Sequence, residues 1–398
     1  INVFDLYFIL TSNQFMKYLK YYLSPLTVIV ALFFILQGKH YPTAFLIGFS
    51  LFIILGDYFI KEDSSEHDYK YPFFLNLPIY LNLPLLFIFI SVSIFALSNE
   101  PSILFSSLFS NTLNLNLVQI SDSFSSLDSI FLIFLSGLFI GIMGTVTGHE
   151  LVHRTKNKFD MFIGNWLLAF SWDCTFAVEH VYGHHKNVAT PIDPATGRRG
   201  ENIYKFIIKA MFSEHKDAWI IEKNRLKIAK KNFISFNNRM LIGYLRSTAI
   251  TLLAYLLGGI HGVLVYLLIA FIAKSLLELI NFAEHYGLVR VEGQPVLPRH
   301  SWNSNATISS LYLFNVTRHS SHHEKSHLKY WELKSYKDSP IMPQGYLTMI
   351  YLGILAPFIF HRMMAKKLIE WDEKYATVEE RLLAQEQNKK SKYLSFIK

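Results

Sequence analysis

The feature that most constrains this chain is a series of long apolar segments separated by polar stretches. A helix needs about 20 apolar residues to cross the hydrocarbon core of a bilayer. The chain is 51% hydrophobic and only 17% charged, against roughly 25% charged in soluble domains. We therefore predict an all-α fold, a six-transmembrane-helix bundle. Its spans are Ser24–Leu36 (beginning earlier, near Tyr18), Tyr41–Ile60, Pro72–Ser98, Ser129–Gly148, Leu241–Leu257 and His261–Phe282.

Glycines and prolines refine this prediction. The pair Gly258-Gly259 predicts a tight turn between the fifth and sixth spans, and Pro78 and Pro84 predict kinks in the third. A further apolar stretch, Gly345–Phe360, is interrupted by Pro357. We expect it to form a packed or interfacial helix and not a seventh span.

The distribution of basic residues predicts the orientation. The segment Asn99–Asp128 has no Lys or Arg, whereas His149–Arg239 has fifteen. Because cytoplasmic loops are enriched in Lys and Arg, we expect the first segment outside and the second in the cytoplasm, together with both termini. The formal net charge of +8 then reflects membrane topology, and no nucleic-acid partner is expected.

These spans divide the chain into four parts. Residues 1–148 hold helices one to four, 149–240 form a cytoplasmic region, 241–284 hold helices five and six, and 285–398 form a second cytoplasmic region. The single cysteine, Cys174, excludes a disulfide framework, a Cys-based zinc site and an iron–sulfur centre within the chain.

Nine of the sixteen histidines fall into four compact groups on the predicted cytoplasmic side. Helical residues four apart share a face, so two such imidazoles can reach one metal. Nine imidazoles are too many for one ion, and we predict two metals with open positions. Imidazole suits iron, copper and zinc alike, so the ligands leave the metal open. The groups are His149 and His153; His180, His184 and His185; His285; and His319, His322 and His323.

Carboxylates accompany these groups. Glu150, Glu179 and Glu284 each lie directly beside a proposed ligand, and Asp193 follows the second group. Bound imidazoles commonly donate their other N–H to a carboxylate, which is the role we expect; surface or capping roles and direct ligation by Glu150 or Glu284 are the alternatives. Glu150, Glu284 and Asp193 are the candidate catalytic carboxylates. The remaining histidines are expected to be ordinary polar residues: His40, His67, His215, His261, His300, His327 and His361.

The histidine groups lie within longer motifs that resemble the four signatures of membrane alkane monooxygenases of the AlkB type. The resemblance covers the chain from the first span to about Leu333. Desaturases and sterol-type hydroxylases share the outer three groups, whereas the element around His285 is similar to the hydrocarbon-hydroxylating branch. The motifs are Gly148–Arg154, Glu179–His185, Asn281–Leu288 and Leu313–His323.

The resemblance implies two non-heme irons held by the nine histidines, and oxygen-dependent hydroxylation of an alkane to a primary alcohol in the bacterial inner membrane. It also implies electrons from a rubredoxin, reduced by an NADH-dependent reductase. Because a rubredoxin needs four cysteines, we expect it to be a separate protein, docking on the basic stretch Lys205–Lys231, which alternatively faces anionic lipid. The chain departs from the family pattern at Ser321, where Asp is usual, and at Glu324–Ser326, which leaves the ligands intact.

Other functions remain open from the sequence. A methyl-aromatic (xylene-type) hydroxylase or a fatty-acyl desaturase would use the same metal site. A membrane zinc protease fits the HExxH pattern of His149–His153, but leaves six clustered histidines unexplained. A metal transporter predicts ligands near mid-membrane. For a hydroxylase, we expect the hydrocarbon to arrive from the bilayer, end-on, through a slot lined by Phe and Leu.

Overall fold

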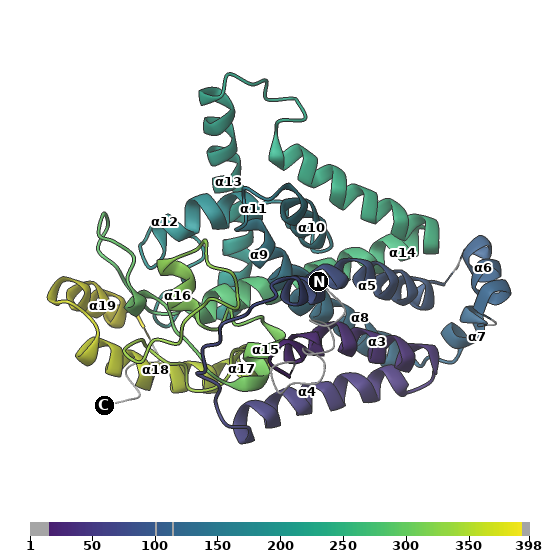
Figure 1. The fold of residues 1–398 in the computed structure, drawn as a ribbon, viewed down its shortest axis with the longest axis horizontal. Helices are drawn as coiled ribbons and strands as arrows, with labels where there is room; N and C mark the ends of the chain where they lie inside the picture. Colours follow the sequence, from purple (N-terminus) through teal and green to yellow (C-terminus); the bar gives the residue numbers. More distant parts are fainter. Residues whose placement is uncertain (1–15, 100–101, 114, 392–398) are drawn as a thin grey trace.

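The computed structural model describes residues 16–99, 102–113 and 115–391, and in them the fold is all-α, as predicted (Figure 1). The only β-type pairing among these residues is an isolated bridge between Asn303 and Ile341. Five helical elements are long and apolar enough to cross a membrane, which makes this a multi-pass membrane protein. They are Met16–Leu36 (α2 and α3), α4 (Tyr41–Phe59), α5 (Phe73–Leu97), Ser126–Val152 (α8 and α9) and α14 (Arg239–His285).

The element α14 covers both the fifth and the sixth predicted spans. Gly258 and Gly259 have non-helical backbone angles inside it, and the φ of Gly259 is positive. A Cβ on Gly262 would lie 2.6 Å from the carbonyl oxygen of Ala254, whereas eight residues of straight helix span about 12 Å. The chain therefore folds back at the glycine pair, and α14 is two helices. How many times the chain crosses a bilayer, and in which direction, stays a prediction.

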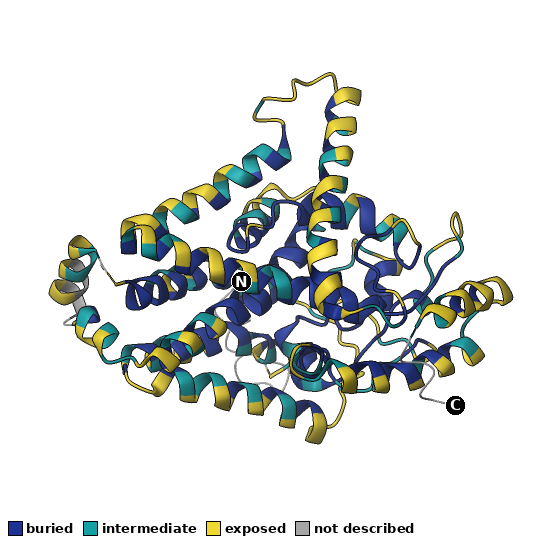
Figure 2. Ribbon diagram, turned by 180° about the vertical axis from the view of Figure 1, so that it is seen from behind, coloured by how far each residue is buried: buried dark blue, intermediate teal, exposed yellow. Residues whose placement is uncertain are grey.

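The long helix of α8 (Ser126–Phe139) and α9 (Val146–Val152) is the most buried of the five elements. It packs against α4, α5 and α14. Gly137 allows this close approach, because a Cβ there would fall 2.5 Å from the side chain of Ile272. The outer helices instead expose apolar side chains such as Leu26, Phe33 and Leu252, as expected for surfaces in contact with lipid (Figure 2).

Several helices outside the spans had no counterpart in the prediction. They are α6 (Ile103–Leu113), α7 (Leu117–Asp122), α10 (Lys158–Ala169) and α13 (Ile203–Ile228). The helix α13 is amphipathic, with many exposed lysines, and its charge hid its helical pattern from a search for apolar runs. The Asn202 side chain caps it by accepting from the backbone N–H of Lys205.

The apolar stretch Gly345–Phe360 forms no span. It is split at Ala356 into α17 (Tyr346–Leu355) and α18 (Pro357–Lys374), with Pro357 in the first turn of α18. Six of the ten α17 residues are buried, which agrees with a packed helix. The polar tail continues into α19 (Val378–Lys390), which begins with a capping box between Thr377 and Glu380.

The histidine-bearing segments meet at one end of the helix bundle (Figure 1). The segment η3 (His180–His184) with α12 (His185–Asn187), and α16 (His319–Glu324), lie beside the ends of α9 and α14. There α18 and α19 lie next to the segments that follow α14.

Candidate metal centre

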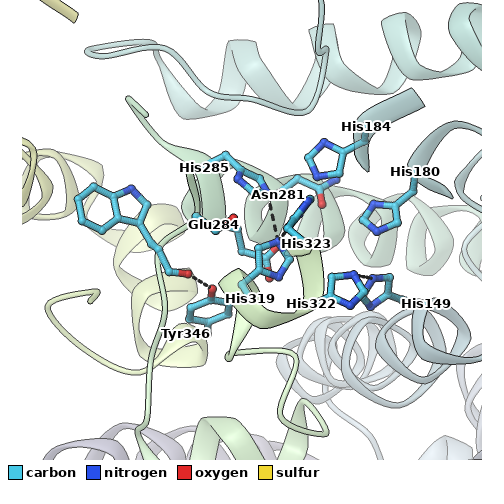
Figure 3. A network of polar contacts seen from close by, with 12 residues as sticks. His149, His180, His184, Asn281, Glu284, His285, His319, His322, His323 and Tyr346 are labelled. Carbon is cyan, nitrogen blue, oxygen red and sulfur yellow. Dashed lines mark hydrogen bonds and ion pairs between the residues drawn. The ribbon is translucent and has the colours of Figure 1, made fainter. Parts of the chain in front are cut away.

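The structure brings all nine predicted histidines together in two adjacent clusters (seven of them are labelled in Figure 3). In each cluster, one nitrogen per residue lies within 4.8 Å of those of all other members. The clusters touch, because the His185 and His323 rings stack with centroids 4.3 Å apart. The five-histidine cluster is His149, His153, His180, His185 and His322, and the four-histidine cluster is His184, His285, His319 and His323.

The Nε2 atoms of the five-histidine cluster converge. His322 Nε2 lies 3.0 Å from that of His149 and 3.1 Å from that of His185, which is 3.2 Å from that of His180. In the four-histidine cluster, His319 Nε2 lies 3.1 Å from that of His285 and 3.0 Å from that of His323. Ligands about 2.1 Å from a six-coordinate ion are about 3 Å apart, so both clusters have metal-like spacing.

The partition of the histidines follows from the local helix type. Residues His180–His184 form a π-helix, whose i→i+5 hydrogen bonds bring residues five apart onto one face. His180 therefore shares a cluster with His185, whereas His184, four residues on, belongs to the other. The expected grouping of His180 with His184 is thus wrong. In α16 the i, i+4 pair His319 and His323 stays together, and His322 joins the five-histidine cluster.

Four of the clustered histidines that lie outside the spans are neutral imidazoles at neutral pH. Burial, reinforced by neighbouring histidines, holds the pKa of His180, His322 and His323 well below the usual range. Burial also lowers the pKa of His153 to about 3. Unprotonated ring nitrogens are the form that binds a metal.

Two histidines have their second ring nitrogen fixed by an acceptor. His184 Nδ1 donates to Asp193 over 2.9 Å, and His285 Nδ1 donates to the backbone carbonyl of His300 over 3.1 Å. Because these groups only accept hydrogen bonds, each Nε2 keeps its lone pair. Burial would raise the pKa of Asp193, but the His184 ring and the Thr196 hydroxyl lower it overall.

The other two candidate carboxylates differ from each other. Glu150 Oε1 accepts from Arg154, with 2.6 Å to Nη2, and from the backbone N–H of Tyr330, so its contacts lead away from the rings. Glu284 Oε2 lies 3.2 Å from His319 Nε2, on the side where the nitrogens converge, and its Oε1 is buried without a partner. Figure 3 shows Glu284 beside His319 and His285.

The residues fit a bound metal pair. His153 Nε2 and His184 Nε2 are buried without a hydrogen-bond partner, although each belongs to a cluster. A buried unsatisfied nitrogen is costly, and a metal ion would satisfy both. The histidines expected to be ordinary do not join the clusters, and His327 is exposed.

Sequence reasoning missed His300, whose backbone carbonyl orients His285 and whose ring lies 2.7 Å from Glu380 Oε1. It also missed Asn281, which lies one helical turn before His285 on α14 and donates to Glu278; Figure 3 draws it with the clustered histidines. Asn281 could have been found from its place in the motif Asn281–Leu288, one helical turn before His285. No pattern in the sequence singles out His300.

Comparison with known proteins finds one matching family model and several related membrane monooxygenases. The family model described as fatty acid desaturase matches residues 129–353. Alkane 1-monooxygenase 2 of Alcanivorax borkumensis is 39% identical over 222 residues, which is 54% of this chain and 58% of that protein. Alkane 1-monooxygenase 1 of Pseudomonas aeruginosa is 37% identical over 226 residues, or 56% and 59%. The match thus spans less than two thirds of these alkane monooxygenases.

One relative aligns over nearly its whole length. The xylene/toluene monooxygenase hydroxylase component XylM of Pseudomonas putida is 30% identical over 377 residues, covering 94% of this chain and 96% of that protein. All nine clustered histidines lie in the segment that the family model matches. The chain therefore belongs to the fatty acid desaturase family, in its AlkB-type group of histidine-rich membrane proteins.

Proposed function

We infer that this protein is an oxygen-dependent hydroxylase of unactivated C–H bonds, and that its substrates are alkanes converted to primary alcohols. The observation that carries the proposal is the pair of buried clusters of five and four imidazoles at one end of an apolar helix bundle. An unactivated C–H bond does not react with the acids, bases or nucleophiles that amino-acid side chains provide. Two irons held by the nine histidines would supply the activation of dioxygen that this reaction needs.

The chain's own residues then orient and enclose the site. His184 and His285 are held in one tautomer by Asp193 and by the His300 carbonyl. Seven of the nine rings are at most 7% exposed, and none of the nine is fully exposed, so bulk water is kept away. The relatives named as alkane 1-monooxygenases support the substrate class.

We propose that the hydrocarbon enters from the bilayer and reaches the centre methyl end first. The apolar surfaces of the bundle support this route. End-on entry gives terminal hydroxylation, and internal alcohols as main products would contradict it. We also propose that the protein lies in the bacterial inner membrane with both termini and the clusters on the cytoplasmic side, which the distribution of basic residues supports.

Electrons are proposed to come from a rubredoxin, reduced by an NADH-dependent reductase. A cleft of about 520 Å³ beside the site supports this, because Asp193 lies in its lining together with five basic residues and two further acidic ones. An acidic donor would bind there close to His184. The basic residues are Arg198, Lys209, Lys216, Arg290 and Lys390.

Product analysis tests the proposal. Membranes containing the wild type or His184→Ala are given octane, dodecane or hexadecane with rubredoxin, its reductase and NADH, and products are identified by gas chromatography. A 1-alkanol that forms only with the wild type and only with the complete electron chain is the expected result. No alkanol from any alkane, with iron present in the sample, would contradict it.

A methyl-aromatic hydroxylase is the second candidate, because XylM aligns over 94% of this chain. Toluene and p-xylene are therefore tested in the same assay. Benzylic alcohols without alkanols would assign the protein to this substrate class and leave the metal centre and its chemistry unchanged.

A further inference from the structure

A buried ionic cluster outside the metal centre has no place in the function so far. Lys274 Nζ lies 2.8 Å from Asp173 Oδ2 and 3.1 Å from Glu214 Oε2, and it also pairs with Glu278. We call these four residues the Lys274 cluster. Lys274 and Glu278 lie on α14, in an apolar span, where ionisable residues are rare and commonly functional.

The cluster contains more acid than base. Three carboxyl groups, each at most 4% exposed, surround one ammonium group. Two uncompensated buried charges would be costly, so a proton is retained. Burial, together with the charge of Glu278, raises the pKa of Glu214, and these two carboxyl groups lie within hydrogen-bonding reach. Glu214 Oε1 is buried without a partner, as expected of a site that can take up or release a proton.

The outer end of the cluster reaches the protein surface. A pocket of about 240 Å³ is lined by Asp173 and Lys274, with Trp172, His215 and Phe271 among its other walls. The Lys274 side chain is 12% exposed, whereas Glu278 is fully buried. Lys274 is therefore open to this pocket, and Glu278 is not.

The inner end points toward the metal centre. Glu278 Oε2 accepts a hydrogen bond from Asn281 Nδ2 over 3.3 Å. Asn281 lies four residues before His285 on α14, so the two side chains share a face of the helix, and Figure 3 draws Asn281 together with the clustered histidines.

We propose that the Lys274 cluster is the proton entry of the enzyme, passing protons from the surface pocket to Glu278 and from Glu278 to the histidine centre, with Asn281 as the hydrogen-bond donor that orients the Glu278 carboxyl group. This rests on the proposed function, in which RH + O₂ + 2e⁻ + 2H⁺ gives ROH + H₂O. The reduced donor supplies both electrons, one oxygen atom enters the C–H bond, and the other leaves as water with the two protons. Metal-bound imidazoles cannot provide those protons repeatedly, so a path from solvent is needed.

The test compares Glu278→Gln and Glu214→Gln with Glu222→Gln, a buried carboxylate on the same helix as Glu214 that contacts only arginines. Alcohol formation from octane, dodecane and p-xylene is measured per iron bound, in H₂O and in D₂O. The relay predicts that Glu278→Gln keeps its iron and its KM for substrate. We expect kcat to fall at least about tenfold, with a larger solvent isotope effect and partial recovery in Glu278→Asp.

Each outcome decides a different point. Wild-type kcat and isotope effect in both iron-loaded Gln variants would overturn the relay alone and leave the cluster a structural ion pair. If Glu278→Gln loses iron or does not fold, Glu214→Gln decides, because it leaves the pairs of Lys274 with Asp173 and Glu278 in place. No alcohol from the wild type would overturn the proposed function, and the relay with it.

Discussion

At the scale of single residues, the acceptor bound by one ring nitrogen of His184 leaves the other ring nitrogen available for a metal. Asp193 accepts from His184 Nδ1 and is itself held by the Thr196 hydroxyl and the backbone N–H of Ala195. This chain of contacts fixes the ring before a metal binds. An acceptor of this kind also raises the basicity of the ligand nitrogen.

Replacing Asp193 with alanine should therefore weaken metal binding about 10- to 100-fold. The measurement is iron retained per protein after dialysis against graded chelator concentrations. Asp217→Ala is the matched control, because Asp217 lines the same cleft. Equal iron retention in both variants would show that Asp193 does not orient His184.

The nine clustered histidines could be predicted from the sequence, because histidines in four compact motifs are rare without a shared function. Their partition could not, since the π-helix at His180–His184 changes which residues share a face. The direction in which the Glu150 carboxylate points could not be predicted from the sequence either. Glu150 and Glu284 each lie directly beside a clustered histidine in the sequence, yet Arg154, one turn after Glu150, pairs with the Glu150 carboxylate and holds it away from the rings.

At the scale of elements, the C-terminal helix α19 supports the metal centre from outside it. Glu380 pairs with Arg299 and with the His300 ring, and the His300 carbonyl accepts from His285. The Trp371 indole also donates to the carbonyl of Arg299 over 2.7 Å. The loop Pro298–His300 is therefore clamped between the tail and a proposed ligand.

Glu380→Ala should release this loop and loosen the His285 ring, so that iron is lost preferentially from the four-histidine cluster. Iron per protein is expected to fall from two toward one in mild chelator. Glu379→Ala, an exposed neighbour in the same helix turn, should keep both irons. Loss of both irons together would mean that the tail stabilises the whole fold instead of one cluster.

A buried set of hydrogen bonds around Glu222 joins α13 to the start of α14. Glu222 accepts from Arg225 Nε and Arg239 Nε, each over 2.8 Å, and from the backbone N–H of Arg239. Burial opposes ionisation, but these hydrogen bonds lower the pKa of Glu222 to about 2. Because this folded-state pKa is below the usual 4.5, the stabilisation is complete at neutral pH and is lost as the pH falls from about 4.5 toward 2.

Glu222→Gln should accordingly lower the Tm in detergent at pH 7 by a few degrees. Near pH 2, where Glu222 itself becomes protonated, the difference from the wild type should shrink. Thermal unfolding followed by circular dichroism across this pH range checks both statements. A Tm difference that does not change with pH would contradict the assignment of the effect to charge.

The helices of the bundle were predictable because crossing a membrane fixes the length and polarity of a segment. The turn at Gly258-Gly259 was predictable as well, since the sequence interrupts the apolar run with two residues that tolerate unusual backbone angles. The amphipathic α13 could not be predicted in the same way, because the lysines along its exposed side interrupt any apolar run in the sequence. The structure shows that α13 is a helix packed against α14.

At the scale of the whole molecule, the membrane helices bear apolar surface, and five basic residues line the cleft beside the clustered histidines. Lys209 and Lys216 lie on α13 at this cleft, and both are exposed. Lys223 and Lys227 lie further along the same helix, are also exposed and do not line the cleft. The two pairs differ in position but not in charge, which makes them matched probes of donor docking.

The double variant Lys209→Glu/Lys216→Glu should raise the KM for rubredoxin at least about tenfold at low salt, because two attractive contacts become repulsive. The effect should weaken as ionic strength rises, since exposed charges are screened over about 10 Å at 0.1 M salt. Turnover driven by dithionite needs no docking and should stay unchanged. Lys223→Glu/Lys227→Glu should leave the KM for rubredoxin near that of the wild type. Equal effects of both pairs would point to general attraction along α13, and no effect of either would leave these lysines in contact with anionic lipid.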